Sequence, residues 1–89
     1  MKIRSKKKMA FLVISVDREG ESPTIKFMGI ATTFASAYKN AKMFGGISEP
    51  NLGYRKAIHQ INQEGKTTIA ESDKSTKFVV IERVPILVS

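Results

Sequence analysis

The residues that could do acid–base or metal chemistry are few in this sequence. It has one histidine, His59, and no cysteine, so a His/Cys metal site lacks ligands and a thiol nucleophile is absent. We interpret His59 as an exposed or capped helix residue rather than a general base. Asp17, Glu19 and Glu21 alternate along the chain but lack the ligand spacing of a calcium loop. The sequence therefore predicts no metal site.

One triplet, Glu64-Gly65-Lys66, has the Glu-x-Lys form found in some nuclease centres. Such a centre also needs a metal-binding aspartate on a neighbouring strand, and Asp73 is the one nearby candidate. The sequence contains no phosphate loop, no Gly-x-Ser-x-Gly element and no dinucleotide fingerprint. We expect a protein that is not an enzyme and that uses no cofactor.

Positive charge is concentrated in two segments of this chain of 89 residues, whose formal net charge is +7. The first eight residues contribute +5 and residues 31–66 contribute +3, while residues 9–30 contribute −1 and residues 67–89 balance. We predict that residues 1–8 form a flexible basic arm and residues 9–89 a single small domain. The basic side chains of the arm are Lys2, Arg4, Lys6, Lys7 and Lys8.

Residues 9–16 form an apolar run that includes Ser15, and this run is far shorter than the roughly 20 residues that cross a bilayer. The run stops at Asp17-Arg18-Glu19 without a small-residue cleavage site, so we do not interpret it as a secretory signal. The expected location is the cytoplasm, with no membrane partner.

Four segments have the composition of β-strands. Residues 9–16 are rich in β-branched side chains and predict a buried central strand. Residues 17–23 carry turn chemistry, and residues 24–30 then predict a second, antiparallel strand. Residues 67–72 and 76–84 predict a hairpin, in which Pro85 should end regular pairing or confine the remainder to an edge. Ile86-Leu87-Val88 is expected to dock on the body of the domain or to serve a partner.

Between the two strand pairs the apolar spacing changes to that of helices. Thr32 and Thr33 are candidate N-caps, and Gly45-Gly46 should end the first helix. The inward stripe of this helix is expected to contain Phe34, Ala37, Tyr38, Ala41 and Phe44.

Ser48-Glu49-Pro50 predicts the start of a second helix, which should run to about Gln63 with Gly53 as a weak point inside it. Its inner face is expected to contain Leu52, Ala57, Ile58 and Ile61. The predicted fold is α+β, with element order β-β-α-α-β-β. A single antiparallel sheet should have the first and fourth strands in its centre and two helices on one face.

Residues 40–58 resemble the helix-turn-helix of DNA-binding proteins. In the first helix, Ala41 is at the small position and Phe44 at the apolar position of the motif, and Gly45 is at its turn. Ile47 is then at the apolar position that seals the angle between the two helices, and Ser48 is at the cap of the second helix. The resemblance implies that the second helix contacts DNA and that the hairpin of residues 67–84 acts as a wing. The implied outward residues are Asn51, Tyr54, Arg55, Lys56 and His59.

Three functional interpretations remain open at this point. The first is a small nucleic-acid-binding regulator or accessory protein, with DNA favoured over RNA, in which the arm provides non-specific affinity. The second is a non-enzymatic inhibitor or adaptor that docks on an acidic protein surface. The third, compatible with the first, is a homodimer formed through an edge strand or the apolar tail.

Overall fold

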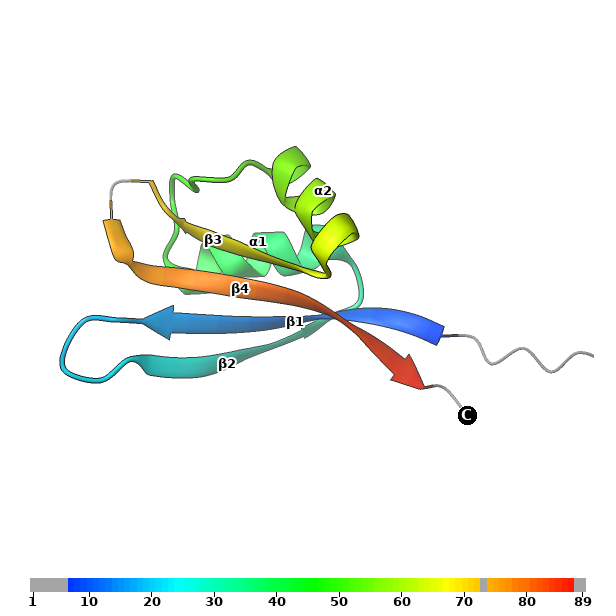
Figure 1. Cartoon of the computed structure of the whole chain (residues 1–89), viewed down its shortest axis with the longest axis horizontal. Helices are drawn as coiled ribbons and strands as arrows, with labels where there is room; N and C mark the ends of the chain where they lie inside the picture. Colours follow the sequence, from blue (N-terminus) through cyan, green and yellow to red (C-terminus); the bar gives the residue numbers. More distant parts are fainter. Residues whose placement is uncertain (1–6, 73, 88–89) are drawn as a thin grey trace, which may run out of the picture.

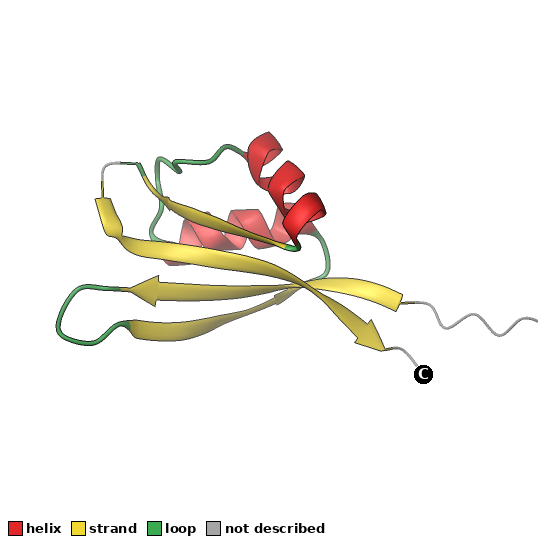
Figure 2. Ribbon diagram, viewed as in Figure 1, coloured by secondary structure: helices red, strands yellow, loops and turns green. Residues whose placement is uncertain are grey.

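The computed structural model describes residues 7–72 and 74–87 as one antiparallel sheet with two helices (Figures 1 and 2). The chain order β-β-α-α-β-β and the α+β class are as the sequence predicts. The sheet order is β2-β1-β4-β3, so the first and fourth strands are central, also as predicted. The elements are β1 (Lys7–Asp17), β2 (Thr24–Ala31), α1 (Phe34–Gly45), α2 (Tyr54–Glu64), β3 (Lys66–Glu71) and β4 (Lys74–Leu87).

β1 begins two residues earlier than the sequence predicts. Lys7 and Lys8 pair with Leu87 and Ile86, because the neighbouring β4 continues far enough to offer them backbone partners. The backbone of these two lysines therefore belongs to the sheet and not to a flexible arm. Residues 1–6, and with them Lys2, Arg4 and Lys6 of the predicted arm, lie outside the described residues.

β4 passes through Pro85 without losing its pairing with β1, so the prediction that pairing ends there is wrong. The N–H of Arg83 donates to the oxygen of Gly65 (2.7 Å) on the β3 side of the strand. The nitrogen of Pro85, two residues on, points to that same side, where β3 no longer runs. The absence of an N–H on Pro85 therefore costs no hydrogen bond between strands. This is the second alternative of the prediction, in which the remainder of the strand lies at an edge of the sheet. Val88 lies outside the described residues.

The helix α1 has the predicted caps. The Thr33 side chain accepts a hydrogen bond from the N–H of Ser36 (3.2 Å), and Gly46 ends the helix in the left-handed region at φ 69°. Phe34, Ala37, Tyr38 and Ala41 are buried, as predicted.

Phe44 is an error of the sequence prediction, because its side chain is 70% exposed. Each helical residue turns by about 100°, and in the last turn the inward direction falls on Gly45 rather than Phe44. A Cβ on Gly45 would lie 2.6 Å from Cγ2 of Val79. The glycine therefore lets the end of α1 approach β4 closely, and Phe44 is turned aside.

The start of α2 also differs from its prediction. The helix begins at Tyr54 with Gly53 as its N-cap, so Gly53 precedes the helix and does not weaken its interior. Residues 48–51 instead run along the outer edge of β3. There the N–H of Asn51 donates to the oxygen of Ala70 (2.8 Å), and Pro50 forms a bridge with Glu71. The open edge of β3 satisfies the backbone of this segment better than a first helical turn would.

The Glu71 carboxylate fixes the same segment from the end of β3. It accepts hydrogen bonds from the N–H of Ser48 (2.9 Å), the N–H of Glu49 (2.8 Å) and the Ser48 hydroxyl (3.3 Å). Ser48 and Glu49, which the sequence predicts as the cap and first-turn acid of a helix, instead donate hydrogen bonds to Glu71 from a loop.

The core lies between the two helices and one face of the sheet. α1 packs on β1, β4 and β2, and α2 packs mainly on β3. The buried cluster contains Val13, Ala31, Phe34, Ala37, Tyr38, Ala41, Ile47, Ala57, Ile61, Ile69, Val79 and Ile81, with Leu52 and Ile58 partly buried against it. The predicted inner face of α2 is therefore confirmed for Ala57, Ile58 and Ile61, whereas Leu52 packs on the core from the segment before the helix.

Candidate nucleic-acid interface

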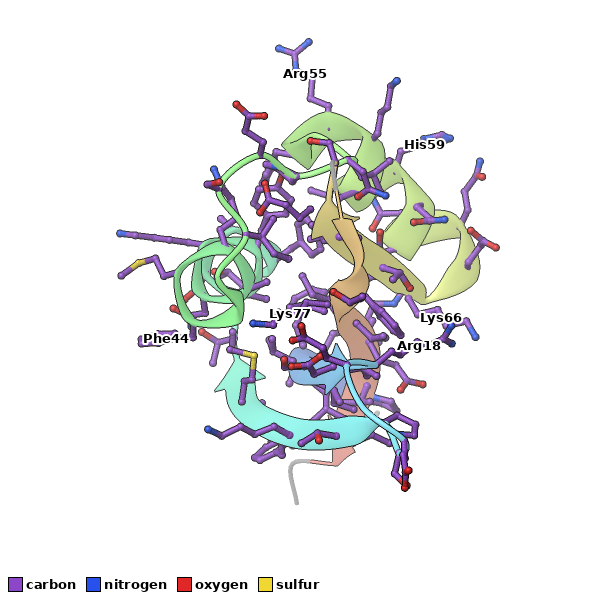
Figure 3. The ribbon with its side chains drawn as sticks, turned by 90° about the vertical axis from the view of Figure 1, so that its left-hand side faces the viewer. Arg18, Phe44, Arg55, His59, Lys66 and Lys77 are labelled. Carbon is purple, nitrogen blue, oxygen red and sulfur yellow. The ribbon has the colours of Figure 1, made fainter. Side chains whose placement is uncertain are left out.

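The outward surface of α2 carries a group of basic and amide side chains. Arg55, Lys56 and His59 are all exposed. Arg55 and His59 stand one helical turn apart and point away from the sheet (Figure 3). Asn62 and Gln63 continue the same surface toward the end of the helix and are also exposed. We call these five side chains the α2 outer surface.

Burial of the opposite stripe fixes which way this surface points. Ala57 and Ile61 are 0% and 1% exposed and face the core. Gln60 is tied to the sheet, because its side-chain oxygen accepts a hydrogen bond from the hydroxyl of buried Thr67 (2.5 Å). A rotation of α2 about its axis would break these contacts, so the α2 outer surface is held toward solvent.

The two cations at the start of α2 do not stabilise the helix that carries them. Arg55 and Lys56 lie in its first turn, which contains no acidic residue and whose N-cap, Gly53, provides no side-chain hydrogen bond. The N-terminal end of a helix dipole is positive and disfavours cations. Their position is therefore not explained by helix stability.

Two of the residues that the helix-turn-helix resemblance implies as DNA contacts, Asn51 and Tyr54, instead contact other parts of the domain. Asn51 lies before α2 and its side-chain oxygen accepts a hydrogen bond from the N–H of Ala70 (3.0 Å). Tyr54 is 38% exposed and its ring packs against Phe34 (5.5 Å between centroids) and Tyr38 (5.4 Å). These contacts hold both side chains against the body of the domain.

Asn62 and Gln63 are absent from the set predicted from sequence. Helical spacing could have predicted them. Asn62 follows His59 by three residues and Gln63 follows it by four, so both lie on the same side of the helix as His59. Amide side chains donate and accept hydrogen bonds and are among the groups that contact phosphates and base edges.

The described lysines at the start of β1 lie toward the end of the sheet where α2 finishes (Figure 1). Arg83 bonds to Gly65, directly after α2, and is also the register partner of Phe11 in β1. Lys7 is four residues from Phe11 along the strand, a distance of about 13 Å at ~3.3 Å per residue. The start of β1 therefore lies at the same end of the sheet as the C-terminal end of α2 and extends beyond it.

The connection between the helices spans residues 46–53, whereas the turn of a helix-turn-helix has about three or four residues. Ile47, the seal residue of the helix-turn-helix resemblance, is 3% exposed in this connection. Leu52 lies before α2 and not within it. The β3–β4 hairpin lies within the sheet, with β4 paired on both sides.

The remaining candidate chemistry is dispersed. Glu64 and Lys66 are exposed at the end of α2 and the start of β3, and Asp73 lies outside the described residues. Within residues 7–72 and 74–87 no three His, Cys, Asp or Glu side chains gather as a metal site would need. In the same ranges, neither helix has the length and apolar composition needed to span a bilayer.

Comparisons of this chain with protein-family models, with curated proteins and with solved structures find no match.

Proposed function

We propose that this protein binds nucleic acid, with duplex DNA as the preferred form, through the α2 outer surface and the basic residues near the start of the chain. The observation that carries the proposal is the exposed group of Arg55, Lys56 and His59, held outward by a helix whose other side is buried. Cations presented on one helix surface attract the phosphate backbone.

The chemistry of the surface supports a phosphate contact. No carboxylate interrupts it before Glu64, and the first turn of α2 combines two cations with backbone N–H groups that lack a side-chain cap. An anion beside that turn would offset the unfavourable position of Arg55 and Lys56. Asn62 and Gln63 add hydrogen-bonding groups further along the helix.

The test is a titration of fluorescent duplex DNA with the protein at two salt concentrations. The variant replaces Arg55 and Lys56 by Gln together, and its matched control replaces Lys26 of β2 and Lys39 of α1 by Gln. Both variants lose two exposed positive charges, but the control leaves the α2 outer surface intact. We expect the α2 variant to bind at least about tenfold more weakly than the control, because each lost phosphate contact also loses counterion release.

An equal loss in both variants would mean that net charge alone determines binding, and would contradict an interface on α2. If the protein does not bind duplex DNA at low salt, DNA is not the preferred form, whether or not the protein binds single-stranded RNA of equal length. Absence of binding to either would contradict the proposal as a whole.

A further inference from the structure

The face of the sheet opposite the core is largely apolar across β2, β1 and β4, whereas β3 adds Lys66 and Thr68 to it. Directly paired residues of an antiparallel sheet point to the same face, and neighbours along a strand point to opposite faces. Val13 and Ile81 are paired and belong to the core, so Leu12 and Ile14 point the other way, with their partners on β2 and β4. We call the following side chains the outer apolar face: Leu12, Ile14, Val16, Ile25, Phe27, Ile30, Phe78, Val80, Val84 and Ile86.

The described helices leave this face uncovered. The buried residues of α1 and α2 belong to the core cluster on the opposite side. Ile25, Phe27 and Ile30 on β2 are 69%, 61% and 60% exposed, and Ile86 on β4 is 41% exposed. In Figure 3, which looks along the strands, the sheet runs from β3 at the top to β2 at the bottom, and α1 lies on one side of β1 and β2 with no helix beside them on the other side.

The strand sequences are those of strands covered on both faces. An antiparallel sheet with one wet face normally alternates apolar and polar residues. In β1, residues 9–14 are apolar without interruption, and in β4 the only charges between residues 78 and 87 are Glu82 and Arg83. Soluble monomers rarely expose apolar patches larger than a few hundred Å². The pattern therefore indicates that another surface covers this face.

The charged side chain of Glu82 also lies on this face, since Glu82 is the register partner of Leu12 on the central strand β4. Glu82 is paired with Lys66 toward the β3 edge. Arg18 lies at the far end, with its guanidinium carbon 5.2 Å from the centroid of the Phe78 ring. The centre, around Ile14 and its partner Phe27, has no charged side chain, so a polyanion would gain nothing there.

We propose that the outer apolar face binds the same face of a second copy of this chain, so that the two sheets pack against each other in a two-fold dimer. The outer apolar face spans three strands, β2, β1 and β4, which at about 4.8 Å apart and about eight residues long give a face of about 14 Å by 25 Å before side-chain corrugation is counted. A standard specific interface buries about 800 Å² of accessible surface per partner, which is the same order of size.

The charge distribution on the outer apolar face is also compatible with a second copy of the chain as the partner. Two-fold packing brings identical surfaces together, which is favourable when the centre of the surface is uncharged. The Arg18 and Lys66 side chains remain at the wet margin, and the α2 outer surface of each copy, on the other side of the sheet, remains free. The proposal therefore does not depend on nucleic-acid binding.

The test is the mass of the full chain by sedimentation velocity over a range of concentrations. The variant is Phe27→Glu on the outer apolar face, and the matched control is Phe44→Glu on α1, since the two phenylalanines are 61% and 70% exposed. We expect a dimer for the unchanged chain and for Phe44→Glu. Phe27→Glu should be monomeric, or weakened in self-association at least about tenfold. Ile25→Glu, at 69% exposure, gives a second variant on the same face.

Circular dichroism and thermal unfolding establish that each variant is folded. A chain that is monomeric at all concentrations would overturn the proposal, and binding of that monomer to phosphatidylglycerol vesicles would assign the face to lipid instead. A dimer that survives both Phe27→Glu and Ile25→Glu, or that is lost only in Phe44→Glu, would place the contact elsewhere and would equally overturn it.

Discussion

The hydroxyl of Tyr38 donates a hydrogen bond to the backbone oxygen of Leu52, at 2.9 Å. Because Tyr38 lies on α1 and Leu52 lies just before α2, this bond joins the first helix to the segment that leads into the second. The Tyr54 ring packs edge-on against the Tyr38 ring directly after that segment. The direction in which α2 leaves the loop, and with it the placement of Arg55 and Lys56, depends on this contact.

Tyr38→Phe should lower the free energy of unfolding by about 1 kcal/mol, because it removes a partly buried hydrogen bond and leaves the Leu52 oxygen without this donor. Urea unfolding followed by circular dichroism measures the difference. Tyr54→Phe is the control, since it retains the bond to Leu52. An unchanged free energy in Tyr38→Phe would show that the bond does not hold the loop.

Ionisation of Tyr38 should contribute to a fall in the free energy of unfolding at alkaline pH. Burial raises the pKa of Tyr38 above its usual value of 10.0. The unfolded chain loses this proton first, so the stabilisation is fully present below about pH 10 and is lost as the pH rises through the raised, folded-state pKa. Between about pH 8 and pH 11, the unchanged chain should lose more unfolding free energy than Tyr38→Phe. An equal loss of unfolding free energy in the unchanged chain and in Tyr38→Phe would show that Tyr38 does not contribute.

Glu71→Ala should destabilise the protein by about 1–2 kcal/mol, because two backbone N–H groups and one hydroxyl lose their acceptor. Glu64→Ala, which removes an exposed carboxylate at the end of α2, is the control and should stay within about 0.5 kcal/mol. Hydrogen exchange should increase at the N–H groups of Ser48 and Glu49 in Glu71→Ala. Unchanged exchange there would argue against the anchoring role of the carboxylate.

Two glycines at the ends of the inter-helix connection should respond differently to alanine. At Gly45 an added Cβ meets the side chain of buried Val79 at 2.6 Å, so Gly45→Ala should cost about 1–3 kcal/mol. At Gly53, with φ −68°, no atom lies within 4 Å of an added Cβ, and Gly53→Ala should be neutral or slightly stabilising. Thermal unfolding of the two variants checks the contrast, and equal effects would count against the close approach of α1 to β4.

If nucleic acid is bound as proposed, affinity should fall steeply with salt. Each phosphate contact contributes about 0.9 to the slope of log affinity against log salt, so removing Arg55 and Lys56 should reduce the slope by up to about 1.8. Substituting Lys2, Arg4 and Lys6 by Gln tests the segment near the start of the chain without cutting into β1, which begins at Lys7. A slope unchanged in the α2 variant would mean that these cations do not contact phosphate.

Local chemistry in the sequence determined much of this fold. The apolar runs predicted all four strands to within a few residues, and two candidate threonines and two glycines predicted both ends of α1. These signals act within one turn or one strand, so neighbouring residues suffice to predict them. Arg55, Lys56 and His59, which the helix-turn-helix resemblance implies as outward residues, are also exposed.

Contacts between distant segments decided the rest. Ser48-Glu49-Pro50 has the local chemistry of a helix start, but the edge of β3 and the Glu71 carboxylate bind it as a loop, so α2 begins at Tyr54. Phe44 has an apolar side chain in a helix, but close packing of Gly45 on Val79 turns it to solvent. The apolar runs of β1 and β4 predicted burial without saying what covers each face. The sequence predicted two helices on one face, but only the tertiary structure shows that Val13 and Ile81 lie under them while Leu12 lies on the uncovered face, because that depends on where residues far apart in the chain meet.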